Sequence, residues 1–555
     1  MNTPTPPPPP PPARMADLDA LRAVAMLLGI AVHASLSFFP SMWMVADSRQ
    51  DGSIGVLFSA LHGFRMPTFF VMSGFFAAML VQRRGPGGMV KHRARRVLLP
   101  MLLGLVTIVP LTNWVSSVAM SDAASGSTVG GRPEADGATT LGDAAAAGDL
   151  DAIESHLASG DDVDAPGGDF RMTPLHRAAI AGRAEAVDLL IRRGATVDAQ
   201  AVDGGTPLHA AAFVGEVAAV SALVEHGADV NAVNRRGATP LDNAVVDAPM
   251  TVYFASLLKL PLDEENLGPR KAEIAETLRA RDAGPGRQAS VIDLLTQIPV
   301  FGHLWFLWFL WWFALGLAAV VAVAGRLPRL RVPAWLVAPP ACYVWPIALT
   351  MLPQMFMGDG GASPLFGPDT STGLLPMPRV MAYYAIFFAF GALGYRLDAR
   401  AGRVGSRWWA PLSIALLVAF PLGMALTMGW PAPLADALAG LDPTARRAIA
   451  VASQAAYPWL MTFGLMGLFR RLCPAEGRTM RYLSDSAYWL YLAHVPLVIA
   501  AQHAARDWPA PAWAKFTIIV VASTAFLLLT YQGMVRHAWV GRLLNGPRPR
   551  AEGAG

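Results

Sequence analysis

The sequence predicts an all-α protein: a polytopic membrane bundle of about ten transmembrane helices, with a soluble α-solenoid of repeats inserted into it. The composition supports the membrane part, because 54% of the 555 residues are hydrophobic and only 15% are charged. Apolar runs of about 20 residues, the length that crosses a bilayer, support the helical bundle. A motif that recurs every 33 residues supports the solenoid.

Ten apolar runs are long enough to cross a bilayer, and the first and sixth are at the short end. They lie at residues 23–39, 56–81, 97–118, 304–324, 333–352, 380–395, 409–429, 448–469, 486–503 and 513–535. Lys and Arg gather in alternate loops, such as 83–96 and 396–407. The positive-inside rule therefore places these loops and both termini in the cytoplasm of a multi-pass inner-membrane protein. The long segment 119–298 then lies on the periplasmic or outer side.

The run Pro6–Pro12 cannot be helical, so we expect a disordered tail at the start of the chain. The predicted organisation is a tail (1–13), membrane spans 1–3 (14–118), a linker (119–140), the repeat block (141–284), a second linker (285–300), spans 4–10 (301–540) and a disordered tail (541–555).

The net charge of +4 conceals a strong asymmetry. Residues 119–298 carry 14 Lys and Arg against 27 Asp and Glu, whereas the remainder carries 30 against 13. An acidic soluble block is therefore inserted in a basic membrane protein, and membrane topology explains the basic excess better than nucleic-acid binding does. The two cysteines, Cys342 and Cys473, predict neither a disulfide nor a zinc site, so we expect no metal.

The inserted block repeats the tetrapeptide Thr-Pro-Leu-His at Thr173–His176 and Thr206–His209, and Thr-Pro-Leu-Asp at Thr239–Asp242. Thr caps a helix, Pro suits its first turn, and Gly suits the left-handed positions that follow each helix. These units closely resemble ankyrin repeats. A degenerate first unit runs from 141 to 165, and an insertion around 249–272 displaces the last helix to Ile274–Gly284. The resemblance implies a stack that binds a protein partner.

The stretch Asp17–Phe39 begins with charged residues and continues as an apolar helix. The eleven steps from Arg22 to His33 turn the helix to within about 20° of whole turns, so both residues share a face, roughly 16 Å apart. Asp19 lies on the same side. A guanidinium at the membrane edge and an imidazole inside the membrane suit a long substrate with an anionic head and a reactive tail. The alternative is an Arg that flanks a span and a His satisfied by a neighbouring helix.

Other polar residues in the spans are also candidates. Arg65 lies about ten residues into the second run, where a charge costs about 2.5–3.5 kcal/mol, so it should face a cavity or bond to helix carbonyls. Arg93 and Arg96 fit either a phosphate site or a simple topology signal. Intramembrane histidines are functional candidates by default, and four of the chain's histidines that lie in or at the edge of spans are candidates here: His33, His62, His303 and His494.

Together these motifs resemble the acyltransferase-3 family, and within it the glucan-biosynthesis membrane succinyltransferases. The resemblance rests on five motifs: the Arg22–His33 pair, Phe-Arg-Met-Pro at Phe64–Pro67 with Ser73–Phe76, Arg93-x-x-Arg96 before Pro100, His303–Leu307, and Tyr482–Leu497. It implies transfer of an acyl group, succinyl or acetyl, from cytoplasmic acyl-CoA to a hydroxyl of an envelope glycan on the outer side. No permanently bound cofactor is expected.

The resemblance also implies roles for single residues. His33 would be the base or acyl relay, and Arg22, Arg93 and Arg96 would hold the anionic CoA. On physical grounds, Asp19 on the same face could pair with Arg22 and fix its rotamer for catalysis. The substrate path would include Arg65, His303, Trp305, Tyr491 and His494. Two other functions remain open: a non-catalytic membrane receptor or scaffold that uses the repeats to bind a protein, and a transporter of lipid-linked sugars.

Overall fold

The fold is described from a computed structural model. The described residues are 15–39, 43–126, 140–167, 171–235, 237–246, 248, 251–252, 255, 262, 264–286, 291–324, 333–358, 366–397, 405–475 and 477–545. The predicted tail 1–13, most of the predicted tail 541–555 and most of the first linker lie outside these residues.

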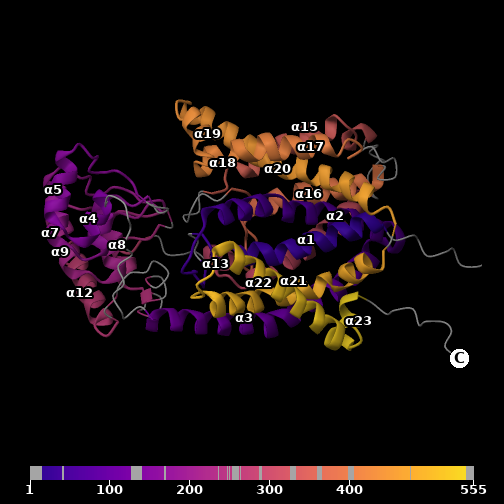
Figure 1. Ribbon diagram of the computed structural model, residues 1–555, viewed down its shortest axis with the longest axis horizontal. Coiled ribbons are helices and arrows are strands. Elements are labelled where there is room, and N and C mark those ends of the chain that lie inside the picture. The colour runs from indigo at the N-terminus through magenta and orange to yellow at the C-terminus, as the bar shows by residue number, and fades with distance from the viewer. Residues whose placement is uncertain are drawn as a thin grey trace, which may run out of the picture.

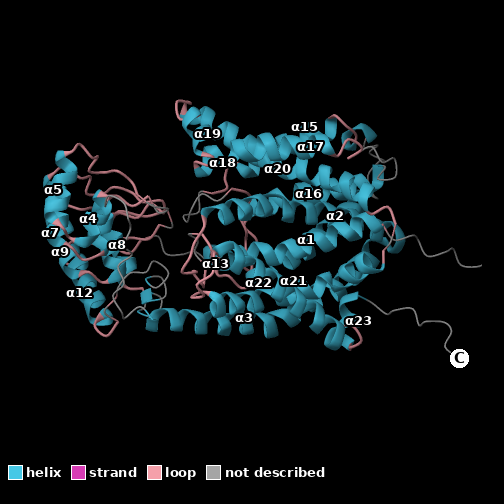
Figure 2. Cartoon of the chain, viewed as in Figure 1, coloured by secondary structure: helices cyan, strands magenta, loops and turns pink. Residues whose placement is uncertain are grey.

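The described residues form helices and no β-strand, as predicted (Figure 2). The membrane part consists of α1 (Ala16–Ser35), α2 (Gly52–Arg93), η1 (Ala94–Leu98), α3 (Leu99–Gly126), α13 (Val291–Gln297), η2 (Gly302–Leu304), α14 (Trp305–Ala324), η3 (Ala334–Val337), α15 (Ala341–Gln354), α16 (Pro378–Leu397), α17 (Trp409–Ile414), η4 (Ala415–Ala419), α18 (Phe420–Met428), α19 (Ala432–Ala437), α20 (Pro443–Leu472), α21 (Arg478–Ala505), α22 (Ala512–Thr530), η5 (Tyr531–Val535) and α23 (Trp539–Asn545).

Six helical runs among the described residues are long and apolar enough to cross a membrane. They are Ala16–Ser35, Gly52–Ala119, Gly302–Ala324, Pro378–Leu397, Trp409–Met428 and Ala512–Val535. The second run contains both α2 and most of α3, and every predicted span overlaps a helix. The prediction of a polytopic helical membrane protein is therefore confirmed. The number of ten spans stays a prediction, because α15, α20 and α21 lie outside this apolar set.

The end of the first predicted span differs from the sequence-based expectation. The first helix ends at Ser35 and not at Phe39, because the backbone turns at Leu36, whose N–H bonds the carbonyl of His33. The Ser35 hydroxyl also donates to the carbonyl of Val32, at 2.7 Å. His33 consequently lies in the last turn of α1, close to the end of the bundle.

The helix α1 lies at the centre of the bundle, between α2 and α21 (Figure 1). On one side α21 also packs against α3 and α22, and on the other side α2 packs against α14, α16 and α20. We call the end of the bundle where α1 begins the near end, and the end where α1 finishes the far end. The helices α1 and α21 both run from the near end to the far end.

A bend in α2 separates its membrane span from its basic end. Gly85 has φ 70° and ψ 169°, which breaks the helix between the apolar run and the segment that carries Arg93. Glycine tolerates this positive φ because it has no Cβ. The bend folds the basic segment back, so that Arg93 donates a hydrogen bond to the carbonyl of Ser73 at 3.3 Å.

The repeat block consists of paired short helices. They are α4 (Leu141–Ala147), α5 (Leu150–Ala158), α6 (Pro174–Ile180), α7 (Ala184–Arg192), α8 (Pro207–Val214), α9 (Val217–Glu225), α10 (Pro240–Ala244) and α12 (Leu267–Arg279). Thr173, Thr206 and Thr239 cap their helices as predicted. Gly215, at φ 83°, ends α8 in the left-handed conformation. The helix α12 packs against α9 and α10 and adds Ile274 and Leu278 to the core of the stack.

The histidines of the repeated motif connect successive repeats. Nε2 of His176 donates to the carbonyl of Gly205 at 3.1 Å, and Nε2 of His209 donates to the carbonyl of Ala238 at 3.0 Å. Nδ1 of each ring closes the capping box with its own Thr. Burial lowers the pKa of both imidazoles below the usual value, so they carry these bonds as neutral rings.

The repeat block lies beyond the far end of the bundle, next to the C-terminal end of α3 (Figure 1). Its helices α4 and α8 are on the side of the bundle, and α5, α7 and α9 are on the outside. The last described helix, α23, lies at the near end, where Arg96 contacts it. The block and α23 are therefore at opposite ends of the bundle.

Candidate active site

The central pair of helices carries the site. Near the start of α1, Nη2 of Arg22 donates to the hydroxyl of Ser484 on α21 at 2.7 Å. Near its end, Nδ1 of His33 lies 3.0 Å from Nε2 of His494 on the same partner helix. The two helices therefore run in parallel and in register, and the face that Arg22 shares with His33 is turned toward α21.

The carbonyl partners decide the tautomers of the two rings. Nδ1 of His494 lies 2.8 Å from the carbonyl of Tyr491, which can only accept, so this nitrogen carries the proton. Nε2 of a neutral His494 is then an acceptor. Nδ1 of His33 lies 3.0 Å from this acceptor and 2.9 Å from the carbonyl of Gly29, which is also an acceptor. Nδ1 of His33 therefore carries the proton and donates it in a hydrogen bond. The remaining nitrogen of His33, Nε2, holds a lone pair and has no hydrogen-bond partner in the described part of the chain.

A glutamine and a tryptophan cover the pair on its far side. Nε2 of Gln502 donates to the carbonyls of His33 and Ala34, each at 3.0 Å. Its Oε1 accepts from the indole of Trp43 at 2.9 Å, and that ring lies 5.9 Å from the ring of His33. The segment that carries Trp43 is anchored by a fully buried ion pair, in which Nζ of Lys515 lies 2.9 Å from Oδ1 of Asp47.

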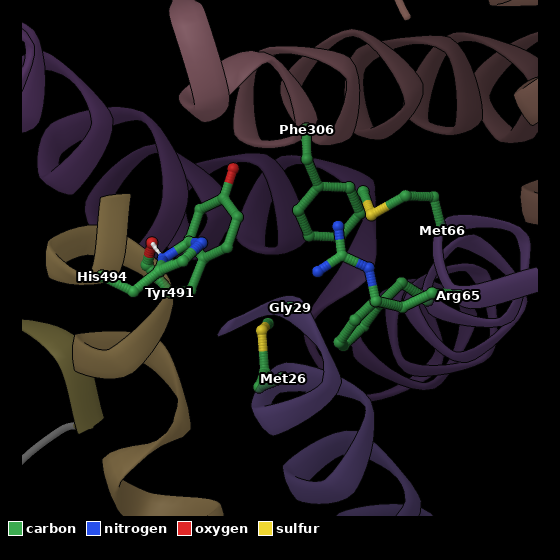
Figure 3. Close-up of a pocket in the computed structure, with 8 residues that line it drawn as sticks. Met26, Gly29, Arg65, Met66, Phe306, Tyr491 and His494 are labelled. Carbon is green, nitrogen blue, oxygen red and sulfur yellow. Dashed lines mark hydrogen bonds between the residues drawn. The ribbon is translucent and has the colours of Figure 1, made fainter. Parts of the chain in front are cut away.

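A small cavity, drawn in Figure 3, lies beside His494, and Met26 and Gly29 of α1, which precede His33, line it on the side of the near end. Eight side chains or backbone positions line it: Met26, Gly29, Arg65, Met66, Phe69, Phe306, Tyr491 and His494. Met26 and Gly29 are on the stripe of α1 between Arg22 and His33, at steps of four, three and four residues. His33 itself does not line the cavity and contacts it through His494.

The guanidinium of Arg65 points into this cavity from α2 (Figure 3). Gly29 makes the room for it, because a Cβ at this position would lie 2.3 Å from Nη1 of Arg65. The same glycine supplies the carbonyl that holds His33, so Arg65 lies against the turn of α1 that orients the imidazole.

Comparison with known proteins identifies the family of the membrane part. A family described as "Acyltransferase domain" matches residues 15–129 and 277–532, which is more than half of the chain. The chain belongs to this acyltransferase family. A second family, described as "Ankyrin repeats (3 copies)", matches residues 141–246. The protein is therefore a membrane acyltransferase with an inserted ankyrin block.

Curated relatives match a shorter stretch of this acyltransferase. Proteins named "Glucans biosynthesis protein C" from Escherichia coli (strain SMS-3-5 / SECEC), Salmonella paratyphi B and Salmonella heidelberg are each 39% identical to it over 94 residues. The matched stretch is 17% of this chain and 23% of each relative, so the chain spans about a quarter of the length of these relatives.

His303 and Tyr491, both predicted to lie on the substrate path, pack beside the histidine pair of the acyltransferase. Nε2 of His303 donates to the carbonyl of Leu492 at 3.0 Å, and its ring lies 5.6 Å from that of His494, edge to face. The Tyr491 hydroxyl donates to the carbonyl of His303 at 2.6 Å. These bonds join η2 and α21 directly beside His494.

Two other candidates lie away from the cavity. Trp305 is buried among aromatic rings, with the rings of Phe309 and Tyr384 at 5.2 and 5.4 Å, and it is not among the cavity-lining residues. His62 stacks on Phe58 and bonds the carbonyl of Pro368 at 3.1 Å. Both side chains are engaged in packing at the positions described.

The predicted donor-binding arginines gather at the near end of the acyltransferase. Besides its bond to Ser484, Arg22 pairs with Asp19 at 3.1 Å, as expected from their shared face. Arg96 donates from Nη1 to the carbonyls of Arg542 and Leu543, at 3.0 and 2.8 Å, and so caps the end of α23. Arg93 bonds only the carbonyl of Ser73 among the described residues.

Several residues of the site were not identified from the sequence. Gln502 lies eight residues after His494 on α21, and this spacing on an apolar helix was a usable signal. Ser484 lies inside the quoted motif Tyr482–Leu497 but carried no assigned role. Trp43 and Gly29 gave no signal, because their importance depends on contacts with α21 and α2.

Proposed function

We propose that this acyltransferase moves an acyl group, succinyl or acetyl, from cytoplasmic acyl-CoA to a hydroxyl of an envelope glycan on the outer side of the membrane. One observation carries the proposal: Arg22 and His33 of α1 are matched to Ser484 and His494 of α21, and a cavity lies along the stripe between the two contacts. This arrangement suits a donor that enters from the near end and an acceptor that approaches from the far end.

The reaction needs a base for the acceptor hydroxyl, and Nε2 of His33 has the free lone pair. In the proposed step this nitrogen takes the proton while the hydroxyl oxygen bonds the thioester carbonyl carbon. The electron pair of the C=O bond moves to the oxygen. When the tetrahedral intermediate collapses, the C–S bond breaks and the leaving thiolate takes the proton from His33, which gives an ester, a free thiol and the neutral imidazole. Transfer through an acyl-His33 relay would use the same lone pair.

The proposed binding site for the acyl-CoA donor depends on the positive charges of Arg22 and Arg93. CoA carries phosphates at one end and a thioester at the other, and Arg forks bind phosphate oxygens well. Arg22 and Arg93 lie at the near end, with Asp19 and Ser484 fixing the rotamer of Arg22. The pantetheine arm would follow Met26 and Gly29 toward the histidine pair.

The proposed acceptor and its surroundings are inferred from the relatives' name and from the position of the ankyrin block. The relatives' name refers to glucans biosynthesis, so a glucan is the acceptor that we propose to test first. The acidic ankyrin block, beyond the far end, is proposed to bind a protein partner beside the acceptor site. No nucleic acid takes part in this scheme.

His33→Ala tests the proposal. We expect transfer to fall by about 10²–10⁴-fold, the usual contribution of a general base, with the protein still inserted and abundant. Mass analysis of envelope glycans from cells that express either form would measure the loss of the acyl substituent. His503→Ala, on the outer turn of α21 and outside the cavity, is the matched control and should keep full transfer. Normal glycan acylation by His33→Ala would reject the assignment of His33.

A further inference from the structure

Arg65 is a half-buried cation inside a membrane span, with no counter-ion among the described residues. It forms no ion pair and no hydrogen bond with the described part of the chain, and its Nε is buried without a partner. A structural Arg in a membrane span would instead donate to helix carbonyls or a carboxylate, because an unpaired buried charge costs several kcal/mol. The cost indicates that the pairing group arrives with the substrate.

The neighbours of Arg65 in the cavity cannot neutralise it. Met26, Met66, Phe69 and Phe306 are apolar. The hydroxyl of Tyr491 is already donated to the carbonyl of His303, and both nitrogens of His494 are engaged by Tyr491 and His33. The cavity therefore presents one fixed positive charge to whatever group enters it.

The position of that charge relates it to the reacting atoms. Nη1 of Arg65 lies against Gly29, whose carbonyl holds Nδ1 of His33. Arg65 thus lies on the side of His33 where Nδ1 donates its hydrogen bond. The lone pair of His33 is on the other ring nitrogen, Nε2. Arg65 and His494 both line the cavity (Figure 3), so a thioester carbonyl bound there with its oxygen beside the guanidinium could direct its carbon toward His494.

We propose that Arg65 binds the thioester carbonyl oxygen and stabilises the oxyanion that forms when the acceptor attacks. The inference rests on the proposed acyl transfer and adds the group that receives the developing negative charge. The charge forms as the C=O electron pair moves to oxygen, and it returns to carbon when the C–S bond breaks. A preorganised cation in a dry site lowers the barrier of this step, since the attraction is strongest where the charge develops.

Arg65→Gln and Arg65→Lys in the full-length protein, purified in detergent and assayed with acetyl-CoA and succinyl-CoA, test the inference. We expect Arg65→Gln to lower kcat by about 10²–10³-fold with both donors while the KM for the donor changes little. Arg65→Lys should recover part of the loss, because it keeps the charge but not the planar fork.

Gly29→Ala is an independent variant that keeps Arg65 itself unchanged in the sequence. The added Cβ would displace Nη1, so kcat should also fall with both donors. Gly316→Ala in α14 is the matched control, because a Cβ there meets nothing within 4 Å and activity should be unchanged. The thermal midpoint of each variant identifies a folding defect, and Gly29→Ala with Arg65→Lys keeps the test available if Arg65→Gln does not fold.

The outcomes separate the inference from the proposed function. If Arg65→Gln keeps its kcat while His33→Ala is inactive, the oxyanion role is wrong and the proposed function stands. A loss confined to succinyl-CoA, seen as a raised KM, would assign Arg65 to the free carboxylate of the acyl group and overturn the oxyanion role. Full activity of both Arg65→Gln and His33→Ala would reject the proposed function as well.

Discussion

The orientation of His33 depends on two acceptors around a single N–H. The carbonyl of Gly29, one turn earlier in α1, accepts on one side, and Nε2 of His494 accepts across the helix interface. The carbonyl of Tyr491 keeps His494 in the tautomer that can accept. His494 thus acts on His33 as a positioning residue, comparable to the orienting partner of a catalytic triad.

The tautomer argument predicts a graded response at His494. His494→Ala removes the acceptor and should lower kcat by about 10²-fold, the lower end of a general-base effect. His494→Gln offers an amide oxygen to the same N–H, so it should recover a large part of the rate. Steady-state kinetics on both variants measures the difference. If Gln and Ala are equally impaired, the acceptor role of His494 is wrong.

At the scale of helices, α2 and α16 cross at close range because each has a glycine at the crossing. A Cβ at Gly74 would lie 1.9 Å from the carbonyl oxygen of Phe388, and a Cβ at Gly391 would lie 1.9 Å from that of Val71. Small residues permit such backbone approach between membrane helices. The crossing fixes α2, and so contributes to the position of Arg65, which lies nine residues before Gly74.

We therefore predict that Gly391→Ala destabilises the bundle by about 1–3 kcal/mol, the usual cost of overpacking. The thermal midpoint of the detergent-purified protein should fall. Gly394→Ala, on the same helix and with nothing within 4 Å of its Cβ, should leave the midpoint unchanged. Equal midpoints for both variants would contradict a rigid crossing.

We predict that the folding stability of the ankyrin repeats decreases in mild acid. Burial lowers the pKa of His176, so the folded ring stays neutral where the unfolded ring gains a proton. Stability is then complete above about pH 6.5, the ordinary pKa of His, and falls as the pH drops from there toward the lowered folded value. Amide hydrogen exchange on the full chain should show less protection of α6 at pH 5.5 than at pH 7.5. His176→Gln should reduce this pH dependence, and an unchanged dependence would rule the imidazole out as its source.

At the scale of the whole molecule, the ankyrin block and the last described helix, α23, lie at opposite ends of the bundle (Figure 1). The basic segment 83–96 is at the near end, where Arg96 contacts α23, and the positive-inside rule assigns that end to the cytoplasm. A long domain's own charges weigh little in topology, so the acidic block does not oppose export. The block would then lie where we expect the acceptor glycan.

A reporter inserted within residues 121–128 tests this placement, and we expect activity only for a reporter that works outside the cytoplasm. Deletion of residues 141–284 should leave the membrane bundle folded and able to acylate a small soluble acceptor. Transfer to the native acceptor should fall, because the proposed partner site is lost. A reporter active only in the cytoplasm would reverse the topology, and undiminished transfer after deletion would make the block a spacer.

The sequence by itself determined what depends on local patterns. Apolar runs located helices at every predicted span, the 33-residue period identified the repeats, and helical periodicity placed Arg22 and His33 on one face. The predicted end of α1 at Phe39 was wrong. The helix ends before a turn at Leu36, and the apolar run continues past this turn to Phe39 without any change in composition. Composition inside a membrane span does not distinguish helix from turn.

Only the tertiary structure decided which candidates meet. The contact of His33 with His494 joins residues 461 apart in sequence, and it requires α1 and α21 to run in parallel and in register. Packing between helices places the Arg65 guanidinium against Gly29. It also places Gln502 where it donates to the carbonyl of His33 at the end of α1. Periodicity fixes the face on which a side chain lies, but the angle and register of helix packing decide what that face touches.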